Sequence, residues 1–333
     1  MSNINNEFET NIEILSNKIV KSFTYNDSNN DEDILYLAHY TDIQSMFNIF
    51  SNNEFWLSHP YDMNDKNELI SYINISKKFI ANSINKFNLY INKNINLMEI
   101  YDEYSDLNNN EHDKIHILCF SEIPYDNQIG KLSMWRGYGG NGSGVAIVFN
   151  GTKFNNINEN HLTFGKVKYL NDYNINVNIN YIIEEFIRFL AENKEVVNQN
   201  DRNIYRFIYV LHKTITMSSM FIKNIGFSEE EEWRLVYFGN DNYDKITLSK
   251  GIFFNPTKYG FNSKLKLTFD NLKYISNSVE FFQKIILGPT QIDSSNEMKH
   301  SLNKINLKNF LKSKGLEVLS NNIVQSSIPY RPR

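Results

Sequence analysis

Three groups of polar residues stand beside apolar segments, where a fold can hold side chains ready for chemistry. The first is His39-Tyr40-Thr41, which follows a short apolar run. The second is Trp135-Arg136 with Tyr138, and the third is Glu232 with Arg234 at the start of another apolar run. An imidazole, aromatic rings and a carboxylate held against apolar strands can bind a ligand and stabilise charge that develops on it.

The acidic run Glu229–Glu232 opens a segment in which polar and apolar residues alternate. This alternation predicts a strand over residues 232–238, with Glu230, Glu232 and Arg234 on one face. One interpretation is a solvated acidic surface. The other is that Glu232 is partly buried beside Trp233 and needs Arg234 or a ligand hydroxyl as its partner.

Five of the 14 glycines lie within eight residues, at Gly137, Gly139, Gly140, Gly142 and Gly144. Their spacing contains G-x-G-x-x-G, but a dinucleotide-binding loop needs a strand before it and a helix after it. Here residues 131–136 have no strand pattern, and 145–149 read as a strand, which argues against a Rossmann site. Two interpretations stay open. The glycines form a hairpin-like loop, or they let the backbone approach a ligand that Trp135, Arg136 and Tyr138 recognise.

The remaining candidates for metal or thiol chemistry are weaker. His112 and His116 are four residues apart, but no HExxH glutamate lies between them and residues 115–120 read as a strand. Cys119 lies within that apolar strand, which is typical of a buried, inert thiol. We therefore expect no metal.

Composition narrows the class of protein. With 333 residues and one cysteine, the chain cannot form a disulfide framework or a cysteine-rich metal site. It has no apolar run long enough to span a membrane, and its polar start is unlike a signal peptide, so we expect a cytoplasmic protein.

The net charge of −4 excludes a uniformly basic nucleic-acid binder. From Asp241 onward, however, 14 basic and 7 acidic residues give +7. Solvated helix faces or a lobe that approaches phosphates would each explain this.

Periodicity predicts an α+β fold built on a mixed or antiparallel central sheet with helical insertions. Strands are expected over residues 34–38, 55–58, 115–120, 144–149, 165–170, 232–238, 265–269 and 284–287. Helices are expected over 7–23, 43–50, from about 68, 179–190, 202–221 and 296–313, before a final extended tail. We expect residues 1–33 to form a helical extension and 34–331 a single domain with helical insertions around 66–110 and 175–225.

An ordered series of short motifs resembles the bacterial "domain of unknown function 2971" family. It starts with His39-Tyr40-Thr41, Leu57-Ser58, Asn64-Asp65 and Glu68, and continues with Cys119-Phe120-Ser121-Glu122, Trp135-Arg136-x-Tyr138-Gly139 and Gly144–Ile147. It closes with Phe227-x-x-Glu230-x-Glu232-Trp233-Arg234, Gly288-Pro289 and Ile328–Arg331. The likeness spans about residues 34–331, and the family name carries no activity.

A looser likeness to the ADP-ribosyltransferase superfold does imply an activity. A strand-borne His39, an aromatic residue and a late strand-borne Glu232 are similar to its His–Tyr–Glu scheme. The likeness implies that His39 and Thr41 hold the ribose or nicotinamide of NAD, that Tyr138 or Trp135 stacks on nicotinamide, and that Arg136 lies near the pyrophosphate. Glu232, or its neighbour Glu230, would bind the ribose hydroxyl and stabilise the oxocarbenium-like state. Tyr40, Ser121 and Arg234 would complete the cofactor-binding set.

This likeness predicts an NAD-dependent ADP-ribosyltransferase, of the kind found among toxins and phage-defence effectors, with NAD as substrate. Its acceptor would be nucleic acid or protein, and an antitoxin or immunity protein would be its partner. The alternative is a non-catalytic regulatory module whose aromatic residues and glycine loop grip a ligand or another protein.

Overall fold

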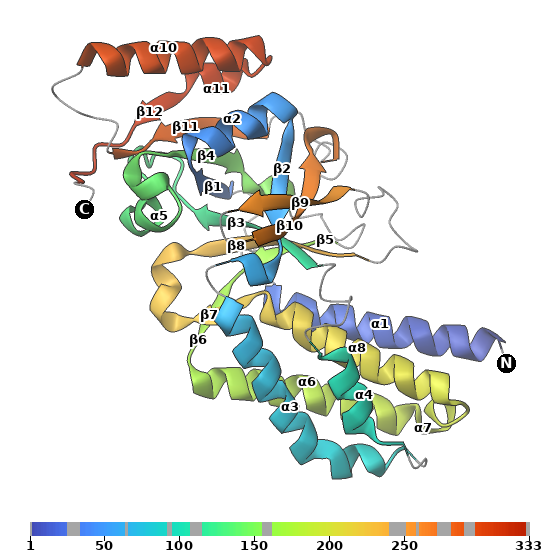
Figure 1. Ribbon diagram of the computed structural model, residues 1–333. Helices are drawn as coiled ribbons and strands as arrows, with labels where there is room; N and C mark the ends of the chain where they lie inside the picture. The colour runs from blue at the N-terminus through green and yellow to red at the C-terminus, as the bar shows by residue number, and fades with distance from the viewer. Residues whose placement is uncertain are drawn as a thin grey trace. The chain divides into compact units, whose positions relative to one another are not determined.

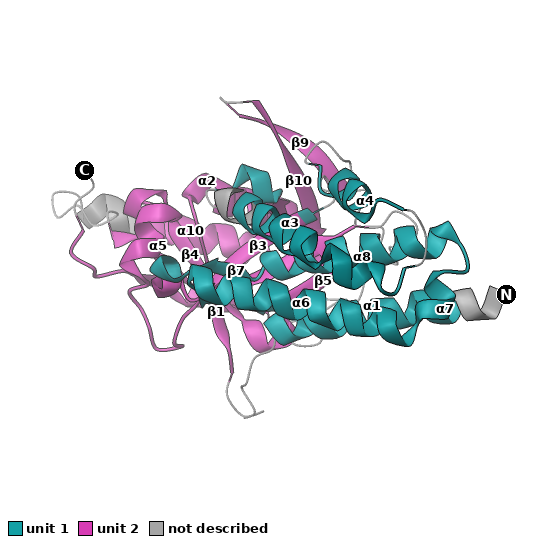
Figure 2. Cartoon of the chain, turned by 90° about the horizontal axis from the view of Figure 1, so that it is seen from below, with its two compact units in different colours: residues 1–26, 59–115, 165–227 teal, residues 27–58, 116–164, 228–333 magenta. Residues whose placement is uncertain are grey.

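The computed structural model describes residues 2–24, 34–63, 66–91, 95–106, 115–154, 162–239, 251–257, 260–271, 281–289 and 297–330. The chain divides into two compact units (Figure 2). The helical unit comprises residues 1–26, 59–115 and 165–227, and the sheet unit comprises 27–58, 116–164 and 228–333. The predicted N-terminal extension and both predicted insertions therefore supply the helices of one unit.

The helical unit is built on long amphipathic helices that bury their apolar faces together. Its elements are α1 (Ser2–Thr24), the 3-10 turn Pro60–Asp62, α3 (Lys66–Asn88), α4 (Leu97–Tyr104), β6 (Lys168–Leu170), α6 (Asp172–Glu192), α7 (Lys194–Val197), α8 (Asp201–Ser219) and β7 (Ile222–Asn224). Phe8, Ile12 and Ile19 recur at helical spacing on α1 and are buried in the same cluster as Phe207 and Ile215 of α8. Asn200 caps α8 by accepting a hydrogen bond from the Asn203 amide at 2.9 Å.

The sheet unit holds most of the strands. They are β1 (Tyr36–Thr41), β2 (Glu54–Ser58), β3 (Ile115–Glu122), β4 (Val145–Asn150), β5 (Leu162–Lys166), β8 (Glu232–Phe238), β9 (Ile252–Thr257), β10 (Gly260–Thr268), β11 (Phe282–Leu287) and β12 (Ile323–Gln325). Its helices are α2 (Ile43–Asn52), α5 (Leu132–Gly137), α10 (Glu297–Ser313) and α11 (Glu317–Asn321), with 3-10 turns at Gly140–Gly142 and Gly151–Phe154. The 3-10 turn Ile225–Glu230 contains the change from the helical unit to the sheet unit, between residues 227 and 228. This composition confirms the α+β class (Figure 1).

Among the described residues these strands form one sheet in the order β12-β11-β4-β1-β3-β2-β10-β9, with β8 pairing both β3 and β5. Strand β1 pairs with β3 and β4, β2 with β3 and β10, β9 with β10, and β4 with β11, all antiparallel, whereas β11 and β12 are parallel. The sheet is therefore mixed and mostly antiparallel, as predicted.

Strand alternation separates two cores on the two faces of the sheet. Leu37 of β1 and Leu57 of β2 lie on the face that α2 covers with Met46, Ile49 and Phe50. A second cluster on the opposite face holds Ala38, Tyr40 and Trp135 of α5. His39 has the same parity as Leu37, so its ring lies on the α2 face, where it meets the edges of Phe55 and Phe120.

Strands β1 and β2 both pair with β3, but at different positions along it. Strand β1 pairs with the carboxyl end of β3, since Leu37 is opposite Glu122 and Ala38 is opposite Ser121. Strand β2 pairs with β3 near its other end, where Ser58 is opposite Ile117. Residues 118–120 of β3 lie between these two contacts, so β1 and β2 diverge there. This divergence creates the space in which the candidate site forms.

Several predicted elements need correction. Residues 165–170 are not one strand but the end of β5 and all of β6, because Val167 interrupts the pairing. The helical spacing of Ile43, Met46, Phe47 and Phe50 predicts one apolar face on α2, but Ile43 and Phe47 are 50% and 47% exposed, and Ile49 is buried instead. Glu230 does not extend β8: it ends a 3-10 turn, and Glu231 then adopts a positive φ of 43°. The final tail contains α11 and β12 as well as extended chain.

The start of α2 offers a test of the fold next to the site. The Asp42 carboxylate accepts hydrogen bonds from the amide and the hydroxyl of Ser45 at 2.7 and 2.9 Å. Replacing Asp42 with Ala removes this cap and should lower the free energy of unfolding by about 1 kcal/mol in urea titrations. Asp42→Asn keeps an acceptor and should unfold like the native protein. Equal losses in the two variants would contradict the capping role.

Candidate functional site

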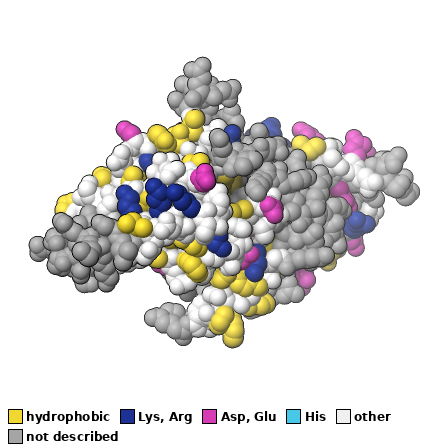
Figure 3. All heavy atoms as spheres, turned by 90° about the horizontal axis from the view of Figure 1, so that it is seen from above, with side chains coloured by type: hydrophobic (Ala, Val, Ile, Leu, Met, Phe, Trp, Pro, Cys, Tyr) yellow, Lys and Arg dark blue, Asp and Glu magenta, His cyan; other side chains and the backbone are white. Residues whose placement is uncertain are grey.

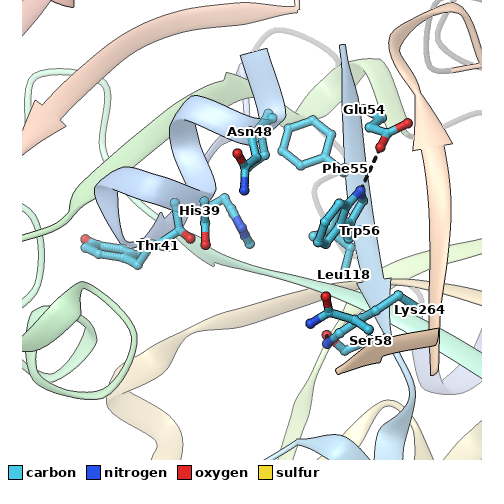
Figure 4. A pocket seen from close by; sticks show the side chains of 13 residues that line it. His39, Thr41, Asn48, Glu54, Phe55, Trp56, Ser58, Leu118 and Lys264 are labelled. Atoms are coloured by element: carbon cyan, nitrogen blue, oxygen red, sulfur yellow. Dashed lines mark hydrogen bonds between the residues drawn. The ribbon is translucent and has the colours of Figure 1, made fainter. Parts of the chain in front are cut away.

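A cavity of about 350 Å³ lies where β1 and β2 diverge. Figure 4 shows side chains from both strands and from α2 around it. Its walls are formed by His39, Tyr40, Thr41, Ser45, Asn48, Ile49, Glu54, Phe55, Trp56, Ser58, Leu118, Asn255 and Lys264. All of these residues belong to the sheet unit. Hydroxyl, amide, carboxylate, ammonium and aromatic groups therefore face one space, which suits a polar ligand that also has a planar ring.

His39 bridges the opening between the diverging strands. Its Nδ1 lies 3.0 Å from the carbonyl oxygen of Cys119 on β3. Because a carbonyl oxygen only accepts, Nδ1 carries the proton and donates it, which leaves Nε2 as the acceptor of the neutral ring. The imidazole points from β1 toward the space between Asn48 and Trp56 (Figure 4).

The protein around His39 also fixes its charge. Burial lowers the pKa of His39 below its usual value, and the hydrogen bond to the Cys119 carbonyl opposes part of that change. The ring is therefore neutral at pH 7. A neutral Nε2 can accept a hydrogen bond from a ligand hydroxyl or take up a proton during a reaction.

The opposite wall is built by β2 and β10 in direct register. Trp56 faces Lys266, and Ser58 faces Lys264. The Trp56 indole nitrogen donates to Glu54 Oε1 at 2.8 Å, and that same oxygen lies 3.4 Å from Lys266 Nζ. Lys264 Nζ donates to Ser58 Oγ at 2.8 Å. Glu54 is only 8% exposed, so the carboxylate in this wall is held by a ring and a cation.

Sequence reasoning missed these wall residues. The alternation Glu54-x-Trp56-x-Ser58 is visible in the chain, as is Lys264-x-Lys266. Their adjacency depends on pairing between strands that lie far apart in the sequence, and that pairing has no local signal.

Tyr40 and Ser121 direct their side chains to structural partners. The Tyr40 hydroxyl accepts from the Lys131 amide at 2.9 Å, its ring meets Trp135 edge to face at 4.9 Å, and burial raises its pKa. Tyr40 also contributes to the cavity wall. Ser121 is fully buried, and its hydroxyl donates to the Glu230 carbonyl at 2.5 Å.

The glycine cluster packs against Trp135 and the end of β1. Trp135 is fully buried and donates from its indole nitrogen to the Ile129 carbonyl at 2.9 Å. A Cβ on Gly139 would lie 2.5 Å from the Trp135 ring, and one on Gly144 would lie 2.2 Å from the Thr41 carbonyl oxygen. These close approaches favour a packing role for the loop, but it joins helix α5 to β4, so the predicted hairpin-like form is wrong.

Arg136 and Tyr138, the other two candidates near the glycine cluster, lie close to Trp135 in the chain. Arg136 is exposed, with its guanidinium 5.7 Å from the Tyr330 ring centroid, and Tyr330 in turn contacts Asn141. Tyr138 is half-buried against the cluster that contains Trp135. The chain near its C-terminal end therefore covers the glycine loop.

Glu232 and Arg234 form a buried ion pair on β8. Arg234 Nε and Nη2 donate to the two Glu232 carboxylate oxygens at 2.8 and 3.0 Å. The residues are 4% and 5% exposed. The predicted partial burial of Glu232, with Arg234 as its partner, is therefore what the structure contains, and the solvated interpretation is wrong for this residue. Glu231, between Glu230 and Glu232, has the left-handed backbone that turns the chain into β8.

The cavity thus gathers His39, Tyr40 and Thr41 from the predicted set. Within the part of the chain that the structure describes, the residues lining it do not include Ser121, Trp135, Arg136, Tyr138, Glu232 or Arg234. Glu54, Trp56 and Lys264 occupy the wall instead.

The weaker candidates were those for metal and thiol chemistry. His116 is buried on β3, and its Nε2 lies 3.0 Å from Ser263 Oγ. Cys119 is half-buried, less enclosed than expected. His112, Asn64 and Asp65 lie outside the described residues. Over the described ranges, no group of three or more His, Cys, Asp or Glu side chains is arranged to hold a metal ion.

Comparison with known proteins supports the family resemblance. Residues 134–235 match the family model described as "Protein of unknown function (DUF2971)", which confirms the likeness to that family. This segment begins in α5 and ends in β8, so it contains the glycine loop and the Glu232–Arg234 pair but none of the cavity-lining residues. No curated protein and no solved structure matches the chain.

Helix length and apolar character decide whether a segment can span a membrane. Across the described helices, none combines the length and the apolar character that a membrane span requires.

Gly144 provides a test of how the loop positions Thr41. Gly144→Ala would place a methyl group 2.2 Å from the Thr41 carbonyl oxygen and 2.8 Å from that of Gly139. Because both atoms belong to the backbone, relief requires movement of the end of β1. We expect a loss of about 1–3 kcal/mol in the free energy of unfolding, measured in urea.

Gly137→Ala is the matched control. A Cβ at Gly137 meets nothing within 4 Å, and the residue ends helix α5. This variant should be neutral or more stable by up to about 1 kcal/mol. Equal destabilisation of the two variants would show that the contact with Thr41 is not the cause.

His39 should make stability depend on pH in a defined direction. Because its pKa is lower in the folded protein than the usual value of about 6.5, the unfolded chain binds a proton first as the pH falls. The contribution of His39 is therefore complete above about pH 6.5 and is lost on acidification, with a slope of at most about 1.4 kcal/mol per pH unit.

The measurement compares the native protein with His39→Asn, whose amide can still donate to the Cys119 carbonyl. Between pH 7.5 and 5, the free energy of unfolding should fall more for the native protein than for His39→Asn. All other titrating groups are common to both proteins. A difference that is constant with pH, or that moves in favour of the native protein in acid, would contradict the lowered pKa.

Proposed function

We propose that the protein is an NAD-dependent ADP-ribosyltransferase that uses the cavity between β1 and β2. The observation that carries this proposal is the placement of a neutral, strand-borne His39 with Thr41 at the opening in the sheet. The cavity wall supplies hydrogen-bonding groups for a ribose and an aromatic ring for a planar heterocycle. Residues 40 and 41 add a backbone edge beside these groups.

In this proposal the nicotinamide–ribose end of NAD lies against β1. Thr41 Oγ1 and His39 Nε2 bind the ribose hydroxyls or the carboxamide. The glycosidic bond breaks, and its electron pair passes to the pyridinium nitrogen, so neutral nicotinamide leaves. An acceptor oxygen or nitrogen then bonds to the ribose carbon, and His39 Nε2 can take the proton that the acceptor releases.

A carboxylate should stabilise the positive charge that develops on the ribose. Glu232 is the residue implied by the ADP-ribosyltransferase likeness, and Arg234 holds it in an ion pair. Glu54 is the carboxylate that lines the cavity. The proposal therefore contains two candidates, which matched Glu→Gln variants distinguish.

The experiment measures nicotinamide release from NAD by the purified full-length protein. Native protein should release nicotinamide, and His39→Ala should lower the rate by at least about 100-fold, as expected for a group that acts on the reacting ribose. Of Glu232→Gln and Glu54→Gln, the variant of the acting carboxylate should lose activity, and the other should keep it. Arg188→Gln, at an exposed position of α6 in the helical unit, is the control and should retain the native rate. No NAD binding and no turnover by the native protein would refute the proposal.

One observation favours the second candidate function, a ligand-binding regulatory module without catalysis. The predicted catalytic Glu232 is neutralised by two hydrogen bonds from Arg234, so it resembles a structural ion pair. If calorimetry detects NAD binding that His39→Ala abolishes, while no nicotinamide is ever released, this second function is the correct one.

The acceptor in the proposal is nucleic acid or protein. Lysines of α10 lie at Lys304, Lys308 and Lys312, four residues apart and therefore along one side of the helix. Figure 3 shows lysine and arginine side chains gathered on the face viewed from above. This basic surface supports an anionic acceptor, and an antitoxin or immunity protein with an acidic surface would be its counterpart.

A further inference from the structure

The wall of the cavity formed by β2, β9 and β10 contains an aromatic ring that is fixed in place. Trp56 is half-buried, whereas Trp135 and Trp233 are 0% and 2% exposed. Its indole nitrogen is held by Glu54, and its ring meets Phe253 of β9 at a centroid distance of 4.9 Å and an angle of 71°. Two contacts therefore set the orientation of the ring before any ligand binds, which lowers the entropic cost of stacking on it.

Positive charge accompanies this ring. Lys264 lines the cavity, and its ammonium group is held by Ser58 at 2.8 Å. Lys266 lies directly across from Trp56, 5.1 Å from the Phe253 ring centroid and 3.4 Å from Glu54. Glu54 lies beside the Lys266 ammonium group, and Lys264 lines the cavity with its ammonium group hydrogen-bonded to the Ser58 hydroxyl.

Amides complete the same wall. Asn255 of β9 and Asn48 of α2 also line the cavity, and each side chain can donate and accept hydrogen bonds. A heterocyclic base presents donors and acceptors on its edge, an aromatic face above and below, and a phosphate linked through its sugar. Amide hydrogen bonds match the edge of the base, stacking matches its face, and an ammonium group matches the phosphate.

We propose that Trp56, Lys264 and Asn255 form a nucleotide subsite, in which Trp56 stacks on the base and Lys264 binds the phosphate. Glu54 is a positioning residue, because it holds the indole and does not itself need to touch the nucleotide. The placement of the nucleotide half of NAD in this subsite rests on the proposed function. Binding of a nucleotide at the subsite requires no turnover. A free nucleotide and a nucleotide within a nucleic-acid strand share this chemistry.

The first experiment uses tryptophan fluorescence of the full-length protein. Because Trp56 is the tryptophan that the cavity exposes, ADP should quench part of the emission in a saturable way. Trp56→Phe should abolish that quenching while calorimetry still detects ADP, since phenylalanine keeps a ring for stacking. Quenching that survives in Trp56→Phe would overturn the assignment of Trp56.

The second experiment measures ADP affinity by calorimetry in side-chain variants. Trp56→Leu and Lys264→Met should each weaken binding about tenfold or more. Lys153→Met, which removes an exposed lysine of the Gly151–Phe154 turn outside the cavity wall, is the control and should bind as the native protein does. Urea unfolding shows whether each variant is folded. If Trp56→Leu does not fold, Trp56→Phe and Lys264→Met still decide the matter.

The ligands distinguish the source of the nucleotide. Binding of ADP and NAD without binding of a short oligothymidylate supports the subsite and assigns it to the free dinucleotide. Tighter binding of the oligonucleotide supports the subsite and assigns it to an acceptor strand. No binding of any of the three, or unchanged affinity in Lys264→Met, overturns it. A protein that binds ADP but never releases nicotinamide from NAD would refute the proposed function and leave this subsite intact.

Discussion

The contact between His39 and the Cys119 carbonyl is the constraint on which the candidate site depends. Strands β1 and β2 both pair with β3, but at different ends, and Cys119 of β3 lies between these two contacts. A buried carbonyl needs a donor, and the His39 imidazole provides one at 3.0 Å. The same hydrogen bond sets the tautomer of the ring and leaves Nε2 as an acceptor. One interaction thus links β1 to β3 and sets the hydrogen-bonding state of a ring that lines the cavity.

Local patterns were enough to predict much of the fold. The alternation over residues 232–238 matches β8 at both ends, and the apolar spacing in 7–23 matches most of α1, because each pattern repeats with the period of its own element. The pairing of Glu232 with Arg234 followed from the same period, since residues two apart on a strand share a face. Glu230 departs from that pattern because the left-handed Glu231 interrupts the alternation.

The site itself depended on information that no single segment contains. His39 was a candidate because it ends an apolar strand, and Thr41 was implied by the ADP-ribosyltransferase likeness; both line the cavity. Trp56 and Lys264 join them only through the register of β2 with β10, which side-chain complementarity across the whole sheet determines. The glycine cluster was ambiguous for a related reason. Its spacing resembles a phosphate-binding loop, but its conformation serves the close packing of Trp135 and of the Thr41 backbone.

The shared strand β3 also means that the width of the cavity is controlled at a distance. Both walls are attached to β3, whose Ser121 is anchored to the Glu230 carbonyl and whose Glu122 amide donates to the Glu231 carbonyl ahead of β8. A slip of β3 by one residue would move β1 and β2 together and would reverse the faces of its side chains. The turn before β8 resists that slip. Substitutions in the acidic segment 229–231 can therefore change the shape of the cavity, although none of these residues lines it.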